Sequence, residues 1–284
     1  MSFSLRGKHA IVVGGTGTLG FRIASALADR GSVVTIMSRN AVDDRQVLES
    51  RLKPFEPLPY MESFEGSRRP TEHQFKRLDV QRIDIFKGLF PTLGPVDVLV
   101  NCAGTSQASV LKRTGEEEIQ RILNLNLRAT ILASKYAKLT PHGCIINVSS
   151  LMATKMGAGA AVYAASKAGV IAFTRALALE YKSRSVRVNT LLPGWIQSPM
   201  WNGESPLPTP SIPGANHPCE DETNVNVQCP VLELPETTRE AYLKQCPLGR
   251  LGTPDEVADA AMFLITNRFA NNCVLNLDGG LSAN

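Results

Sequence analysis

Tyr163 and Lys167 lie four residues apart, and Ser150 stands upstream of them. Residues at this spacing share a helix face, so a helix over residues 162–180 would place the phenol and the ammonium in one cleft. A cation beside a phenol favours the phenolate and lowers a pKa that is ordinarily about 10. Tyr163 is therefore a candidate proton donor. The Ser150 hydroxyl is a candidate to hold the carbonyl oxygen that receives the proton.

The segment Tyr-Ala-Ala-Ser-Lys also arises by chance on helix surfaces, so this interpretation depends on its surroundings. A glycine-rich turn, Gly14-Gly15-Thr16-Gly17-Thr18-Leu19-Gly20, follows the first predicted strand. Glycines let the backbone approach a pyrophosphate, and the N-terminus of the next helix offers free N–H groups and a favourable dipole. The G-x-G-x-x-G spacing alone is a weak pattern, and a flexible turn without a ligand is the alternative.

The end of the second predicted strand favours NADP(H) over NAD(H). Sites for the unphosphorylated cofactor usually carry an acidic residue there, which binds the ribose 2′-hydroxyl. This chain has Ser38 and Arg39 instead. Ser38 does not repel a phosphate, and the Arg39 guanidinium can pair with one. The alternative is that Arg39 is a solvated loop charge, which a preference for NADH would support.

Two further strand ends carry small or polar residues that suit a nucleotide. Asp79 follows the third strand and could accept from the adenine amino group, while Val80 packs on the ring. Asn101, Ala103 and Gly104 end the fourth strand and allow a nucleotide to lie against the backbone. Each segment alone is more often a turn. Together they mark the edge at which open α/β sheets bind nucleotides.

Composition and length favour a globular α/β protein. The 284 residues suffice for one large domain or two small ones. A net charge of +4, from dispersed Lys and Arg, gives no argument for nucleic acid. No apolar run approaches the roughly 20 residues that cross a bilayer. The six cysteines lack Cys-x-x-Cys and metal-ligand spacing, which indicates reduced thiols in an intracellular protein. We expect no cleavable secretory signal and no metal site.

Short β-branched runs alternate with amphipathic helical stretches, the pattern of a parallel sheet covered on both faces. Strands are predicted at residues 9–13, 32–37, 75–78, 96–101, 144–148, 186–191 and 273–277. Helices are predicted at residues 19–30, 42–52, 115–138, 162–182 and 254–266. The predicted fold class is α/β, with a seven-stranded parallel sheet in a single doubly wound Rossmann-type domain over residues 1–284.

Two segments interrupt this alternation. Residues 53–72 contain four prolines and predict an irregular surface excursion. Residues 201–235 are rich in proline and follow the sixth strand at the carboxyl edge of the sheet. Long loops in compact domains are functional or disordered. We interpret residues 201–235 as a substrate lid, with an inert insertion as the alternative.

The chain resembles the short-chain dehydrogenase/reductase family over nearly its whole length. The motifs that carry the resemblance are the Gly14 to Gly20 turn, Asp79, Asn101-Cys102-Ala103-Gly104, Asn126, Ser150, Tyr163-Ala164-Ala165-Ser166-Lys167, Pro193-Gly194 and Asp278-Gly279-Gly280. Within the family, the chain is most similar to 3-oxoacyl-acyl-carrier-protein reductases, especially eukaryotic mitochondrial-type ones. That closer similarity lies in residues 110–114, 126–127, 246–254 and 277–280.

The resemblance implies a role for each matching residue. Tyr163 would be the acid, Lys167 would lower its pKa and hold the nicotinamide ribose, and Ser150 would bind the carbonyl. Asn126 would hold a water that links Lys167 to solvent. The implied cofactor-binding residues are Gly14, Thr16, Thr18, Leu19, Gly20, Ser38, Arg39, Asp79, Val80, Asn101, Ala103, Gly104, Tyr163 and Lys167, with Pro193, Gly194 and Ile196 at the nicotinamide carboxamide.

Several positions depart from the family pattern. Thr18 stands where a middle glycine is expected, and Gly17 stands where many NADP-using members carry a basic residue. Arg184 matches a basic position that contacts the carrier protein, but Leu139 occupies the second such position. The segment 201–235 is longer than carrier-protein reductases usually have. These departures bear on the 2′-phosphate and on the substrate rather than on the proton donor.

The sequence predicts an NADP(H)-dependent oxidoreductase that reduces a ketone to a secondary alcohol, with 3-oxoacyl thioesters of fatty acid synthesis as the substrate. Another carbonyl substrate, such as a polyketide-type aromatic ketone, a steroid or a sugar, is one alternative. A catalytically silent NADP-binding subunit of a hetero-oligomer is the other. The resemblance implies a homo-oligomer, a dimer or a tetramer. We expect an intracellular protein of the mitochondrial matrix or cytoplasm, with no nucleic-acid partner.

Overall fold

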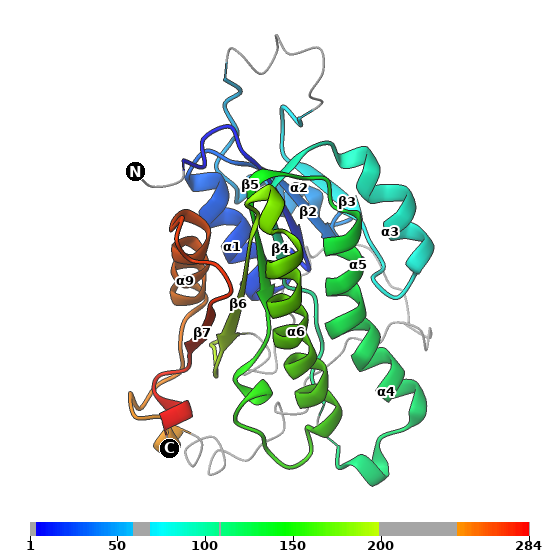
Figure 1. Cartoon of the computed structure of the whole chain (residues 1–284), viewed down its shortest axis with the longest axis vertical. Helices are drawn as coiled ribbons and strands as arrows, with labels where there is room; N and C mark the ends of the chain where they lie inside the picture. Colours follow the sequence, from blue (N-terminus) through cyan, green and yellow to red (C-terminus); the bar gives the residue numbers. More distant parts are fainter. Residues whose placement is uncertain (1–3, 59–68, 108, 199–242, 284) are drawn as a thin grey trace, which may run out of the picture.

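A parallel sheet of seven strands forms the centre of the molecule (Figure 1). The computed structural model describes residues 4–58, 69–107, 109–198 and 243–283. The strands are β1 (His9–Val13), β2 (Val33–Ser38), β3 (Gln74–Arg77), β4 (Val96–Asn101), β5 (Leu139–Val148), β6 (Arg187–Pro193) and β7 (Val274–Leu277). Their order is β3-β2-β1-β4-β5-β6-β7. The order reverses between β1 and β4, where sheets of this kind leave a crevice for a ligand.

Helices cover both faces of the sheet. One face carries α1 (Thr18–Asp29), α2 (Arg45–Ser50) and α9 (Pro254–Thr266), as Figure 1 shows for α1 and α9. The other face carries α3 (Ile83–Leu89), α5 (Ala129–Tyr136) and α6 (Ala161–Glu180), and α4 (Glu116–Leu123) precedes α5. The predicted doubly wound α/β architecture is therefore confirmed.

The five central strands, β2, β1, β4, β5 and β6, contribute side chains to two separate cores, one on each face of the sheet. In β1, Ala10 and Val12 pack with α1 and α9, whereas Ile11 and Val13 pack with α3, α5 and α6. All four side chains are buried. Successive side chains of a strand point to opposite faces, so a strand buried on both faces needs a continuous apolar run. This requirement explains why the strands could be recognised in the sequence.

Shorter helical segments complete the described secondary structure. The 3₁₀ segments are Phe90–Leu93, Leu111–Arg113, Leu151–Ala153, Lys182–Arg184 and Leu281–Ala283, and one π-helical turn spans Asn124–Arg128. The segment predicted as one helix at residues 115–138 is helical, but it is not a single regular α-helix. It consists of α4, the π-helical turn and α5, and it ends at Tyr136.

Other boundaries also differ from the prediction. The helix α3 was missed because its seven residues are too few for a clear helical period. Strand β5 begins at Leu139, five residues before the predicted start. Pro141 and Gly143 are unfavourable in the interior of a strand, but Leu139 pairs with Val96 across a register shift.

The described parts of residues 53–72 carry no helix or strand, as the prolines predicted. The segment predicted to be a lid, residues 201–235, lies outside the described residues. Within the described chain, α6 alone has the length and apolarity of a membrane span, contrary to our expectation that no stretch comes near these values. Half of that stretch is buried inside the protein, as in the core helix of a globular fold.

Candidate active site

Two glycines of the glycine-rich turn, Gly14 and Gly20, have no space for a side chain, and Gly14 packs against the residues that follow β4. An added Cβ at Gly14, where φ is +78°, would lie 2.5 Å from the backbone nitrogen of Ala103. A Cβ at Gly20 would lie 2.2 Å from the carbonyl oxygen of Gly14. Gly17, in contrast, meets only one atom at 3.4 Å and begins α1 without a side-chain cap. The N-terminus of α1 therefore keeps N–H groups for an anion.

A cavity of about 270 Å³ lies beside this turn, at the carboxyl ends of β1, β2 and β4. Its lining residues are Gly14, Thr16, Gly17, Ser38, Arg39, Asn40, Leu78, Val80, Cys102, Ala103, Gly104, Thr105, Ser106 and Leu125. Seven of the predicted cofactor residues therefore line one cavity: Gly14, Thr16, Ser38, Arg39, Val80, Ala103 and Gly104. The sequence had not singled out Asn40 or Leu125.

The end of the cavity that Ser38 and Arg39 line, beside the end of β2, is positively charged. Arg39 is exposed, and no carboxylate of the described chain pairs with it. The nearby carboxylate of Asp43 instead contacts Arg77, at 2.6 Å. The hydroxyl of Ser38 is buried and has no hydrogen-bond partner among the described residues. This end of the cavity therefore offers a cation and a free hydroxyl to an anionic ligand.

Asp79 and Asn101, both predicted to bind the cofactor, do not line the cavity. Asp79 accepts a hydrogen bond from the Gln81 N–H at 3.0 Å and so stabilises the turn after β3. The buried Asn101 amide donates to Asn147 and to Ser134. Asn101 therefore connects β4 with β5 and α5, a contact between distant segments that the sequence does not reveal.

Lys167 is a residue of α6, and its buried ammonium reaches the carboxyl end of β5. Its Nζ donates to the Val148 carbonyl at 3.0 Å and lies 6.0 Å from the centre of the Tyr163 ring. The side chain is 5% exposed, and this burial lowers the pKa of Lys167 to about 8. A Cβ at Gly104 would lie 3.2 Å from Nζ, so this glycine lets the loop after β4 approach the ammonium closely.

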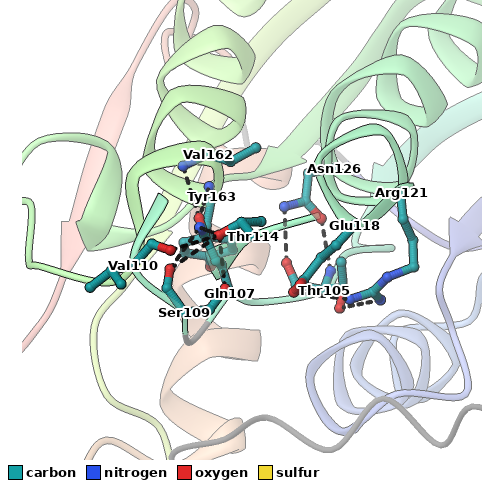
Figure 2. A network of polar contacts seen from close by, with 10 residues as sticks. All are labelled: Thr105, Gln107, Ser109, Val110, Thr114, Glu118, Arg121, Asn126, Val162 and Tyr163. Carbon is teal, nitrogen blue, oxygen red and sulfur yellow. Dashed lines mark hydrogen bonds and ion pairs between the residues drawn. The ribbon is translucent and has the colours of Figure 1, made fainter. Parts of the chain in front are cut away.

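Asn126 occupies the π-helical turn between α4 and α5 and is fully buried. Its Oδ1 accepts the Thr105 N–H at 2.7 Å, and its Nδ2 donates to the Thr105 carbonyl (Figure 2). The Nδ2 also donates to the Ser166 hydroxyl at 3.0 Å. Such turns insert one extra residue and are frequent at functional sites. Asn126 thus connects the wall of the cavity with the helix that carries Tyr163.

Ser150 follows β5 and begins the 3₁₀ segment Leu151–Ala153. Its hydroxyl oxygen accepts the Met152 N–H at 3.2 Å. The hydroxyl proton remains available for an acceptor outside this turn. Because β5 and the loop after β4 end at the same edge of the sheet, Ser150, Lys167 and Gly104 belong to one region of the surface.

The predicted nicotinamide-carboxamide loop follows β6 at the same edge. Pro193 ends β6, and the Gly194 N–H donates to the Leu277 carbonyl at 2.8 Å. A Cβ at Gly194 would lie 2.8 Å from the Cα of Asp278, which explains the glycine. Ile196 pairs with Gly252. These residues do not line the 270 Å³ cavity.

Arg184 lies after the opposite end of α6 from Tyr163. With a rise of about 1.5 Å per residue, the two positions are roughly 30 Å apart along the helix. The Arg184 guanidinium donates to the Leu139 carbonyl. Within one chain, this arginine is therefore remote from the cavity.

The family model described as short chain dehydrogenase matches residues 71–206. A 3-oxoacyl-(acyl-carrier-protein) reductase of Chlamydia muridarum is 30% identical over 99% of this chain and 100% of its own. Carbonyl reductase family member 4 of Danio rerio is 31% identical over 96% and 98%. Such similarity along whole chains indicates common ancestry, and the protein therefore belongs to the short-chain dehydrogenase family of oxidoreductases, which act on carbonyl and alcohol groups.

Proposed function

We propose that the protein binds NADPH and reduces a ketone to a secondary alcohol. The observation that carries this proposal is the approach of Lys167 to both the Tyr163 ring and the loop that lines the cavity. When bound, the reduced nicotinamide supplies the hydride that the ketone carbon receives. The protein supplies orientation and the proton.

The residues around the cavity fit a dinucleotide phosphate. Gly14 packs closely against Ala103 and has no side chain that would keep a ligand from the backbone, and α1 begins without a side-chain cap. Both features suit a pyrophosphate. Arg39 and the unpartnered hydroxyl of Ser38 favour a 2′-phosphate, because a guanidinium and a hydroxyl are both donors to phosphate oxygens. We therefore favour NADPH over NADH.

In the proposed mechanism, Ser150 holds the ketone oxygen and Tyr163 protonates it. The Lys167 ammonium stabilises negative charge on the Tyr163 oxygen, which makes the phenol a better acid. Asn126 fixes Thr105 and Ser166 and so holds the cavity wall against α6. The Ser150 hydroxyl and the Tyr163 phenol both donate to the ketone oxygen, and they therefore stabilise the negative charge that develops on this oxygen during reduction.

We propose a 3-oxoacyl thioester as the substrate, carried by an acyl carrier protein or by coenzyme A. The support is similarity to reductases named for that substrate, in Chlamydia muridarum and in Thermotoga maritima, each 30% identical. A second candidate is another carbonyl compound, favoured by the similarity to carbonyl reductase family member 4. The position of Arg184 supplies no support for carrier-protein contact near the site within one chain.

NADPH oxidation by the purified full chain separates these candidates. We expect turnover of acetoacetyl thioesters with a kcat/KM at least about tenfold above that of a bulky cyclic ketone, a difference of about 1.4 kcal/mol. The reverse order would favour the second candidate. The absence of turnover with either class, alongside tight NADPH binding, would contradict the proposed activity and favour a silent subunit.

We also propose an intracellular homo-oligomer, either a dimer or a tetramer. Cys102, Cys144, Cys246 and Cys273 are free thiols in the described chain, which suits a reducing compartment. Light scattering of the purified protein measures the mass of the particle and tests the assembly directly.

A further inference from the structure

The helix α6 begins without a capping residue of its own. Its N-cap position is Ala160, whose side chain accepts no hydrogen bond. The first N–H groups of any helix lack partners within the helix and need outside acceptors. Here the N–H groups of Val162 and Tyr163 both donate to Oε1 of Gln107, at 2.8 Å and 3.0 Å (Figure 2). A residue more than fifty positions upstream therefore caps the helix that carries Tyr163.

The amide of Gln107 is held in one orientation. Its Nε2 donates to the Ser109 carbonyl and to the Thr114 hydroxyl, each at 3.0 Å. Rotation of the amide would turn the NH₂ group toward two N–H donors and the oxygen toward a carbonyl. The side chain is 7% exposed, and this set of partners uses both donors and both acceptor positions. Gln107 is consequently a rigid, fully satisfied cap.

The loop that ends at Gln107 is also the wall of the cavity. Residues 102–106 line the cavity, and Gln107 follows directly. The middle of the loop is held by Asn126, which binds both backbone groups of Thr105. One short segment therefore connects the cavity with the backbone of Tyr163. Displacement of this segment along the helix axis would move the phenol relative to a bound nucleotide.

We infer that Gln107 is a positioning residue, which fixes the placement of Tyr163 relative to the cavity by capping α6. This inference rests on the proposed function, because it assigns the effect to proton donation by Tyr163. A misplaced catalytic group costs turnover even when binding is intact. Loss of the cap should therefore lower kcat and leave the affinity for NADPH nearly unchanged, since none of the Gln107 hydrogen bonds involves residues 102–106.

A double-mutant cycle tests this inference. Gln107→Met keeps the length of the side chain and removes the acceptor. We expect it to lower kcat about tenfold, with the dissociation constant of NADPH within about twofold of the wild-type value. In a Tyr163→Phe background, the same substitution should lower the residual kcat by less than about twofold, because a residue that acts through Tyr163 has nothing left to position.

Asn189→Leu is the matched control. Asn189 is a fully buried amide that donates to the Ala270 carbonyl and accepts the Cys273 N–H, far from the start of α6. It should lower the melting temperature about as much as Gln107→Met and keep kcat near the wild-type value.

If Gln107→Met does not fold, Thr114→Val removes one partner of the Gln107 amide and leaves the cap in place. A smaller loss of kcat, absent in the Tyr163→Phe background, is then expected.

Three outcomes would overturn the inference: an unchanged kcat in Gln107→Met (or in Thr114→Val where that variant replaces it), an equal loss of kcat in Asn189→Leu, or full additivity with Tyr163→Phe. In each of these cases the proposed function still holds, provided that the wild-type protein reduces the ketone and Tyr163→Phe loses that activity. A wild-type protein that oxidises no NADPH with any ketone would instead remove the proposed function and this inference together.

Discussion

At the scale of the residue, the buried ammonium of Lys167 predicts a pH dependence. Burial lowers its pKa to about 8, so the cation is lost as the pH rises through that value. We expect kcat/KM for NADPH, which reports the free enzyme, to fall above about pH 8. The measurement is a pH profile at constant ionic strength. A flat profile from about pH 6 to about pH 10 would contradict a role for the Lys167 charge.

Arg39 predicts the choice of cofactor. Hydrogen bonds to charged groups contribute about 1.5–3 kcal/mol, so Arg39→Ala should weaken NADPH binding roughly 10- to 100-fold. Binding of NADH should change little, because that cofactor lacks the 2′-phosphate. Arg45→Ala is a suitable control, since Arg45 is an exposed arginine that contacts Glu49 and does not line the cavity. Equal losses for both cofactors would show that Arg39 does not bind the phosphate.

The sequence could predict the placement of Tyr163 and Lys167, because helical spacing and strand ends are local features. It could not predict the role of Gln107. That amide lies in a loop, and its importance depends on two N–H groups from a distant helix. Nor could it show that the Asn101 side chain turns away from the cavity toward Asn147. Contacts between segments far apart in the chain decide both cases.

At the scale of the element, the strands β1 and β4 and the helix α9 have the predicted bounds. Each combines a clear apolar pattern with a clear end signal. For α9 the signal is the capping box of Thr253 and Glu256 with proline at the start. The π-helical turn at Asn126 has no such signal. It forms where the Asn126 amide binds Thr105 and Ser166, and a periodic pattern does not report one extra residue.

The end of α9 depends on one buried cation. Arg187, on β6, donates to the carbonyls of Leu264 and Ala270, at 2.6 Å and 2.8 Å. The last carbonyls of a helix lack partners within it, and a cation there also complements the helix dipole. We expect Arg187→Met to lower the free energy of unfolding by about 2–4 kcal/mol, because it leaves buried carbonyls unpaired. Urea unfolding measures this change.

Arg82→Met is the control for that experiment. Arg82 contacts Asp84 on the surface, where ion pairs contribute little. Its unfolding midpoint should stay near that of the wild-type protein. Similar midpoints for the two variants would show that the Arg187 hydrogen bonds do not stabilise the end of α9.

At the scale of the whole molecule, the two edges of the sheet differ in chemistry. The carboxyl edge holds the cavity, whereas the amino edge holds a buried polar cluster around His9 and Asp97. His9 contacts the Pro95 carbonyl and the Thr35 hydroxyl, each at 2.8 Å. Asp97 accepts from the His9 N–H and contacts Arg69. This cluster connects β1, β2 and β4 with the described end of the 53–72 excursion.

His9 predicts an acid-sensitive stability. Burial lowers its pKa from 6.5 to about 4, so the unfolded chain binds the extra proton first as the pH falls. The free energy of unfolding should therefore decrease from about pH 6.5 to about pH 4, by on the order of 3 kcal/mol. Denaturant unfolding at several pH values measures the slope. His9→Gln should flatten it in that window, and an equally steep slope in this variant would assign the effect elsewhere.

The central claim, that this oxidoreductase reduces a ketone with Tyr163 as the proton donor, is tested most directly by one substitution. Tyr163→Phe keeps the ring and removes the hydroxyl. With NADPH and an acetoacetyl thioester, we expect kcat to fall about 10²- to 10⁴-fold while the dissociation constant of NADPH changes little. A Tyr163→Phe protein that reduces the thioester at the wild-type rate would contradict the claim.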